Sequence, residues 1–96
     1  MRIDFNNNNG NLNVALDGRL DTVTAPELES FINQKYDGKA SLVIDCEKLT
    51  YVSSAGLRVL LGAQKKTKGA MKLKNVNELI MEVFEMTGFT DILTIE

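Results

Sequence analysis

The chain has 96 residues, 44% hydrophobic and 25% charged, which are ordinary values for a globular protein and leave room for one domain over residues 1–96. Its 11 basic and 13 acidic residues give a net charge of −2, which argues against direct binding of nucleic acid. The sequence contains no histidine, which excludes Ser-His-Asp and Cys-His nucleophilic catalysis and most zinc sites.

The N-terminal stretch MRIDFNNNNG contains no apolar signal region, and no apolar run approaches the roughly 18 residues that a membrane span needs. We therefore expect a soluble, cytoplasmic protein that does not bind the membrane. Cys46 is the only cysteine, so an internal disulfide is excluded. It lies within an apolar run, and we expect a buried, unreactive thiol.

The first two segments predict a β-hairpin. Residues 2–5 and 12–18 flank the cluster NNNNGN, whose asparagines and glycine readily adopt the positive φ angles of a tight turn. Alternation places three apolar side chains on one face of the second strand: Leu12, Val14 and Leu16.

A helix and a buried strand are predicted next. Thr24 and Glu27 have the spacing of a capping box at the start of the helix, and the residues DGK at 37–39 end it. The short apolar run SLVID at 41–45 predicts a central strand that is buried on both faces.

The second half predicts two helices and two strands. A helix begins near residue 54, followed by a strand at 71–74. A second helix, capped by Asn75 and stopped by Gly88, precedes a last strand at 91–95. We expect a solvated acidic face on that helix, formed by Glu78, Glu82 and Glu85. Five apolar residues on and around it are expected to pack in the core or at its rim, with a hydrophobic groove for a partner as the alternative; these are Met71, Met81, Met86, Phe84 and Phe89.

The resulting order is β-β-α-β-α-β-α-β. Strands connected through crossover helices run parallel, and the hairpin adds an antiparallel member. The expected fold class is α/β: a small mixed sheet, mostly parallel with an N-terminal antiparallel hairpin, covered by helices.

The stretch YVSSAGLRVLL at 51–61 places two serines between a predicted strand and a predicted helix. A helix N-terminus presents free N–H groups and partial positive charge, so it favours an oxyanion, and serine is also a preferred cap. Ser53 or Ser54 could therefore cap the helix or be a site of phosphorylation. Gly56 would let another molecule approach the backbone, and Arg58 could pair with a phosphate on Ser54.

The sequence argues against two other functions, a catalytic serine and a nucleotide-binding loop. SSAG is not the G-x-S-x-G elbow of a catalytic serine, and no histidine can serve as its base. The chain also lacks G-x-x-x-x-G-K-[ST], which argues against a nucleotide-binding loop.

Three stretches resemble a known family: GRLDTVTAPELE at 18–29, LVIDCEKLTYVSSAGLRVLL at 42–61 and KLKNVNELIMEVFEMTGFTDIL at 72–93. The order of these motifs matches the family, and the likeness extends over essentially the whole chain, which is similar to a STAS domain of the anti-sigma factor antagonist (anti-anti-sigma factor) group. The family's G-x-L-D pattern survives here, with its aspartate at Asp21 expected beside the phosphosite. From the residues alone, Asp21 could equally be a turn or cap residue.

The family's usual motif is Asp-Ser-Ser/Thr-Gly-Leu, and aligning its glycine and leucine places the phosphorylated serine on Ser54. The motif's acidic residue then falls on Ser53 and its second hydroxyl on Ala55, while Arg58 occupies a position that is often glycine. Ser53 remains the alternative phosphosite. The resemblance implies that the partner is bound by eight residues: Asp21, Thr22, Ser53, Ser54, Ala55, Gly56, Leu57 and Arg58.

The resemblance implies a monomeric, non-enzymatic partner-switching protein without cofactor or metal. Unmodified, it would bind an anti-sigma factor that is also a serine kinase, and so free a sigma factor for transcription. Phosphorylation by that kinase would end the contact, and a serine phosphatase would restore it. The alternatives are a constitutive STAS subunit of a larger assembly, such as a lipid-transport ATPase or stress complex, and, last in rank, a nucleotide-binding or hydrolytic role.

Overall fold

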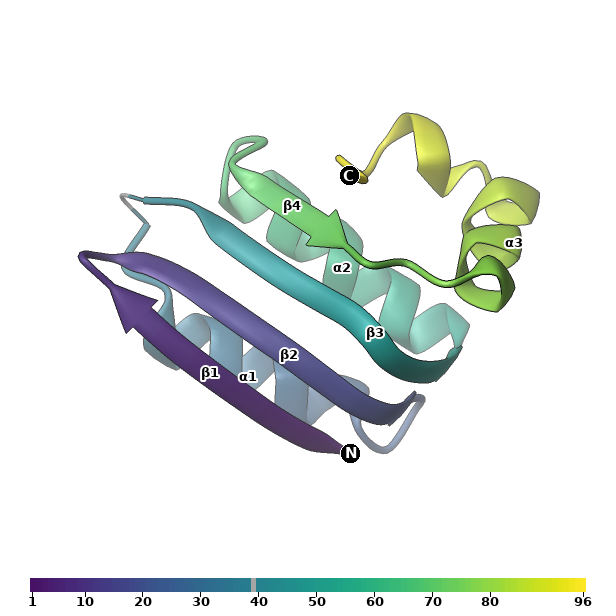
Figure 1. The fold of residues 1–96 in the computed structure, drawn as a ribbon, viewed down its shortest axis with the longest axis horizontal. Helices are drawn as coiled ribbons and strands as arrows, with labels where there is room; N and C mark the ends of the chain where they lie inside the picture. The colour runs from purple at the N-terminus through teal and green to yellow at the C-terminus, as the bar shows by residue number, and fades with distance from the viewer. Residues whose placement is uncertain (39) are drawn as a thin grey trace.

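The computed structural model describes residues 1–38 and 40–96, in which four strands form one mixed sheet in the order β1-β2-β3-β4 (Figure 1). β1 is antiparallel to β2, whereas β2, β3 and β4 run parallel to one another, as expected. The strands are β1 (Arg2–Asn8), β2 (Asn11–Leu20), β3 (Leu42–Val52) and β4 (Met71–Lys74).

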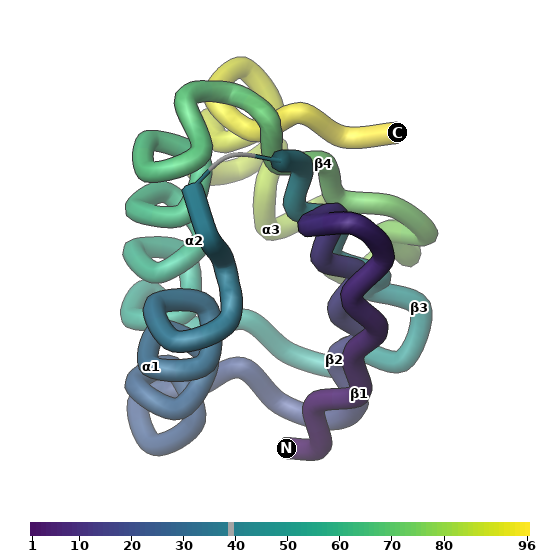
Figure 2. The backbone as a smooth tube through the Cα atoms, turned by 90° about the vertical axis from the view of Figure 1, so that its left-hand side faces the viewer, coloured from purple at the N-terminus to yellow at the C-terminus, as the bar shows by residue number. Residues whose placement is uncertain are grey.

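Two helices cover one face of this sheet. α1 (Ala25–Lys35) connects β2 to β3, and α2 (Ser54–Lys66) connects β3 to β4. Figure 2 shows α1 and α2 together on one side of the strands. Both crossovers step in the same direction along the sheet, and because such connections are right-handed, both helices pack on the same face.

The prediction that the strand at 41–45 is buried on both faces is therefore wrong. Leu42, Ile44 and Cys46 point into the core and are fully buried, whereas Val43 and Asp45 lie on the other face and are only half-buried. None of the helices formed by the described residues crosses that face in Figure 1. The strand is also longer than predicted, because it continues to Val52.

α3 (Glu78–Thr87) lies beside the ends of β3 and β4 (Figure 1). It is capped by Asn77, whose side-chain oxygen accepts a hydrogen bond from the Ile80 N–H at 3.0 Å, so the prediction of Asn75 as the cap is wrong. Asn75 has a φ of 57° in the turn after β4, a conformation that asparagine tolerates. Gly88 ends the helix in the left-handed conformation, as predicted.

Two other local predictions fail. The Thr24 hydroxyl does not cap α1; it donates a hydrogen bond to the Arg19 carbonyl at 2.6 Å and accepts one from the Asp21 N–H, so no capping box forms. The expected last strand is reduced to one parallel bridge between Ile95 and Leu73, after a short 3-10 helix, η1 (Phe89–Asp91). The four-residue strand β4 offers few partners for a longer ladder. Lys39, in the predicted helix stop, lies outside the described residues.

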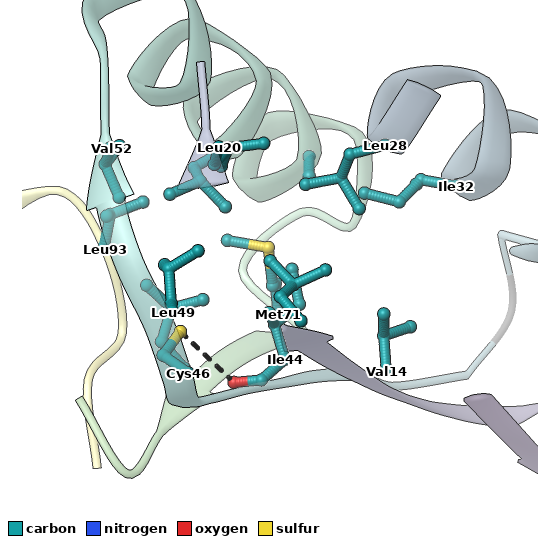
Figure 3. Packing of buried hydrophobic residues seen from close by; sticks show 14 of the residues in the cluster. Val14, Leu20, Leu28, Ile32, Ile44, Cys46, Leu49, Val52, Met71 and Leu93 are labelled. Carbon is teal, nitrogen blue, oxygen red and sulfur yellow. Dashed lines mark hydrogen bonds between the residues drawn. The ribbon is translucent and has the colours of Figure 1, made fainter. Parts of the chain in front are cut away.

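The core lies between the sheet and the helices, and Figure 3 shows Leu20, Leu28 and Met71 meeting within it. Cys46 is fully buried there, with its thiol 3.8 Å from the Ile44 carbonyl oxygen. Burial raises the pKa of the Cys46 thiol to about 12, with a smaller contribution from the charge of Asp45. The expected unreactive thiol is consistent with this environment.

We expect Cys46 to react with a thiol-specific reagent slowly in the native protein at mildly alkaline pH, because the thiolate is both scarce and inaccessible. Unfolding in guanidinium should make the reaction fast and stoichiometric. The absorbance of the released chromophore measures both rates. Rapid, complete labelling of the folded chain would contradict this burial.

Gly56 in the first turn of α2 has a close neighbour, because a Cβ built there would lie 2.8 Å from Leu20 Cγ and 2.9 Å from the Leu20 carbonyl oxygen. Gly56→Ala should therefore lower the free energy of unfolding by about 1–3 kcal/mol, despite the better helix propensity of alanine. Urea unfolding followed by circular dichroism measures the change.

Gly62 in the same helix provides the matched control, because a Cβ added there would meet no atom within 4 Å. Gly62→Ala should stabilise the protein by about 0.5–1 kcal/mol. Equal effects of the two substitutions would show that the contact with Leu20 does not matter.

Candidate functional site

The carboxyl ends of β2 and β3 lie side by side and place two turns together. Leu20 pairs with Val52 at the ends of the strands, and the Ser53 N–H donates a hydrogen bond to the Leu20 carbonyl at 2.9 Å. The chain then leaves β2 through Asp21 toward α1, and leaves β3 through Ser53 into α2. The structure thus brings the predicted residues at 21–22 next to those at 53–58.

Ser53 caps α2. Its backbone is extended, with φ −91° and ψ 175°, and its hydroxyl oxygen accepts a hydrogen bond from the Gly56 N–H at 3.2 Å. Its carbonyl accepts the first helical bond, from the Leu57 N–H. The capping interpretation of the serine pair is therefore satisfied by Ser53, and its half-buried hydroxyl is already engaged.

Ser54 is the first residue of α2, and its side chain is exposed. Within the described residues its hydroxyl has no hydrogen-bond partner. Arg58 follows one helical turn later on the same side of the helix; it is also exposed and forms no ion pair with a described residue. The first turn of α2 contains no acidic residue, so the positive end of the helix dipole is not neutralised there.

Asp21 organises the turn from β2 to α1. Its Oδ1 accepts hydrogen bonds from the backbone N–H groups of Val23 at 3.0 Å and Thr24 at 3.1 Å. The hydrogen bond from the Thr24 backbone is the main reason why the pKa of Asp21 is lowered, and the charge of Arg19, 3.7 Å away, contributes to it. Asp21 is thus a turn residue, and it directly follows Leu20, whose carbonyl accepts the hydrogen bond from the Ser53 N–H.

The remaining predicted contact residues differ in accessibility. Thr22 is exposed and Ala55 is half-buried, whereas Gly56 and Leu57 are buried. Gly56 is expected to admit another molecule, but the atoms that come close to it belong to Leu20 of the same chain. Glycine is required here by packing within the fold.

Three exposed residues at this end of the molecule were missed. Arg19 and Tyr51 pair across β2 and β3, and the guanidinium carbon lies 4.2 Å from the centre of the tyrosine ring. Val23, in the turn before α1, is 76% exposed. Arginine and tyrosine are enriched in interface hot spots. Only the strand register brings Arg19 and Tyr51 together, so no pattern along the sequence could have indicated them.

Two negative findings apply to residues 1–38 and 40–96. No cluster of cysteine, aspartate and glutamate side chains there could hold a metal ion. None of the described helices has both the length and the apolar character needed to cross a bilayer.

Comparison with known proteins identifies the class of this domain. Residues 2–96 match the model of the STAS domain, and the chain belongs to this family. It is 31% identical over 98 residues to the anti-sigma-B factor antagonist of Bacillus subtilis (strain 168), an alignment that covers 99% of this chain and 90% of that relative.

The fold is shared with solved structures of the anti-sigma factor antagonist SpoIIAA. The unphosphorylated form has a TM-score of 0.79 at 15% identity, and the alignment covers 99% of this chain and 88% of the SpoIIAA chain. The phosphorylated form, from Bacillus, has a TM-score of 0.73 at 15% identity, with coverage of 99% and 91%. At this identity the likeness shows the fold.

The different positions of the two serines predict different effects on stability. Ser53→Ala should lower the free energy of unfolding by about 1 kcal/mol, because the Gly56 N–H loses its partner. Ser54→Ala should change it by less than about 0.5 kcal/mol, because the exposed hydroxyl is not bonded.

Ser53→Asp serves as the rescue variant, since aspartate is an equally good cap. Urea unfolding of the three variants and the parent measures the differences. Equal stability of Ser53→Ala and the parent would contradict the capping role.

Proposed function

We propose that this protein is an anti-sigma factor antagonist that binds an anti-sigma factor serine kinase, and that phosphorylation of Ser54 ends this binding. The observation that carries the proposal is the difference between the two serines. The Ser53 hydroxyl caps α2, whereas the Ser54 hydroxyl is exposed at the positive end of the helix and forms no hydrogen bond with any described residue. The names of the curated relatives support the same role.

The contact surface that we propose surrounds Ser54. It combines predicted residues that are accessible, namely Asp21, Thr22, Ala55 and Arg58, with the exposed side chains of Val23 and Tyr51. Ser53 contributes by fixing the start of α2, and it remains the alternative phosphosite. Gly56 and Leu57 act through packing, because neither is accessible.

Electrostatics supplies the switch. A phosphoryl group on Ser54 adds about 1.5 to 2 negative charges at pH 7. The helix N-terminus and Arg58 can hold this dianion without unfolding α2. At a desolvated contact that faces the kinase's bound nucleotide, the same charge meets like charge and packing is lost. SpoIIAA was solved in both states, and this chain's fold matches both, which supports a switch without refolding.

The proposed cycle needs two further partners. The bound kinase would release its sigma factor, transfer phosphate from ATP to Ser54 and then dissociate. A serine phosphatase would hydrolyse the phosphoserine and return the antagonist to its binding form. The chain itself would catalyse no step, would need no cofactor, and would act in the cytoplasm as a monomer that contacts neither DNA nor membrane.

The test measures binding to the anti-sigma factor kinases of the same organism, with nucleotide present. We expect Ser54→Ala to bind like the parent and Ser54→Asp to bind roughly 100- to 1,000-fold more weakly, because a few kcal/mol of repulsion and lost packing correspond to this range. Mass spectrometry after incubation with kinase and ATP should place the phosphate on Ser54.

Ser53→Asp is the matched control, since it adds the same charge one residue away in a side chain that caps the helix. We expect it to retain most of the affinity. Equal binding of the kinase by Ser54→Ala and Ser54→Asp would contradict the switch and favour a constitutive interaction module. A phosphate on Ser53 would overturn the choice of serine.

A further inference from the structure

The outward side of α3 carries an apolar strip whose two end residues, Leu79 and Met86, are exposed, whereas Val83 between them packs partly against the core. Leu79, Val83 and Met86 follow one another at the i, i+4, i+7 spacing of one helical face. Leu79 is 59% exposed and Met86 is 86% exposed, and Val83 is half-buried between them. The prediction that Met86 packs in the core or at its rim is wrong, because its side chain is exposed.

An acidic strip runs alongside the apolar strip. Glu78, Glu82 and Glu85 are exposed on the neighbouring face of α3, and together with Val76 and Met81 they line a groove of about 400 Å³. Within the described part of the chain, none of the three carboxylates forms an ion pair or a side-chain hydrogen bond. α3 itself contains no lysine or arginine.

This arrangement is unfavourable for the isolated helix. Glu78 and Glu82 are four residues apart, and Glu82 and Glu85 are three apart. In each pair the two carboxylates are neighbours on the helix surface and repel each other. Glu85 also lies in the last turn, where the helix dipole disfavours negative charge, and no basic residue offsets it there. Positively charged groups from outside the chain would offset the repulsion in both pairs and the unfavourable interaction of Glu85 with the helix dipole.

We propose that α3 is a docking surface for a basic amphipathic helix of a protein partner. The apolar row of that helix packs on Leu79, Val83 and Met86, and its adjacent lysine or arginine row lies along the groove against the three glutamates. An amphipathic helix can contact both strips at once, because it presents an apolar row and a basic row side by side, as α3 presents an apolar row and an acidic row. This surface does not include Ser54 and does not depend on its phosphorylation.

Other occupants fit the same surface poorly. In a two-fold dimer that packs the apolar strips of antiparallel α3 helices together, the two acidic strips would face each other, which is unfavourable. An anionic lipid surface would be repelled by the acidic strip. Charge complementarity therefore selects a basic partner.

The test uses the full chain labelled with nitrogen-15 and two synthetic helical peptides. The peptides share a leucine row at i, i+4 and i+7, and the adjacent row is lysine in one and glutamate in the other. We expect the lysine peptide to shift the amide resonances of residues 78–87 saturably, with an affinity that falls as salt is added. The glutamate peptide should leave them unchanged.

Charge reversal on α3 gives the decisive comparison. Glu82→Lys combined with Glu85→Lys should weaken binding of the lysine peptide by about tenfold or more, and should allow the glutamate peptide to bind. The matched control is Glu27→Lys with Glu29→Lys, which makes the same charge change at exposed positions of α1. It should leave the affinity within about twofold of the parent.

Leu79→Ser combined with Met86→Ser tests the apolar strip and should also abolish the shifts, while the exposure of both side chains preserves the fold.

Four outcomes would overturn the proposal. These are equal binding of the two peptides, shifts confined to residues outside α3, the same loss of binding in the α1 control, and self-association of the chain through α3 in sedimentation experiments.

Discussion

The contact between the end of β2 and the first turn of α2 is the constraint on which this structure depends. The Leu20 carbonyl accepts a hydrogen bond from the Ser53 N–H, and the space beside Leu20 admits Gly56 only because glycine has no side chain. These two contacts fix where α2 begins and how closely it approaches the sheet. They also join the turn at Asp21 to the serine pair, so the candidate site is built around a buried leucine.

This junction gives two adjacent serines opposite environments. Ser53 must be extended to reach Leu20, and its hydroxyl then meets the Gly56 N–H, whereas Ser54 begins the helix and points its hydroxyl outward. A charge placed on Ser54 therefore acts on the surface of the molecule and not on its core. The positive end of α2 and the nearby Arg58 make that charge tolerable for the folded chain.

The direction of the chain through the sheet decides which surfaces are available. Because both crossovers step the same way, α1 and α2 cover one face, and α3 is placed beside the ends of β3 and β4 (Figure 1). α3 buries only Ile80 and Phe84 fully, so its outward side is free to carry the apolar and acidic strips. The Ser54 site and the α3 surface are thus distinct consequences of one topology.

The sequence by itself determined the order of the elements through β4 and α3, the start of α2 at the serine pair and the burial of Cys46, because each depends on local patterns of apolar and capping residues. Only the tertiary structure decided which serine is free, that Asn77 rather than Asn75 caps α3, and that one face of β3 stays open. It also brought Arg19 onto Tyr51 and left Met86 in solvent. The open face of β3 and the contact of Arg19 with Tyr51 depend on crossover direction and strand register, which relate residues far apart in the chain and cannot be read from a periodic pattern along it.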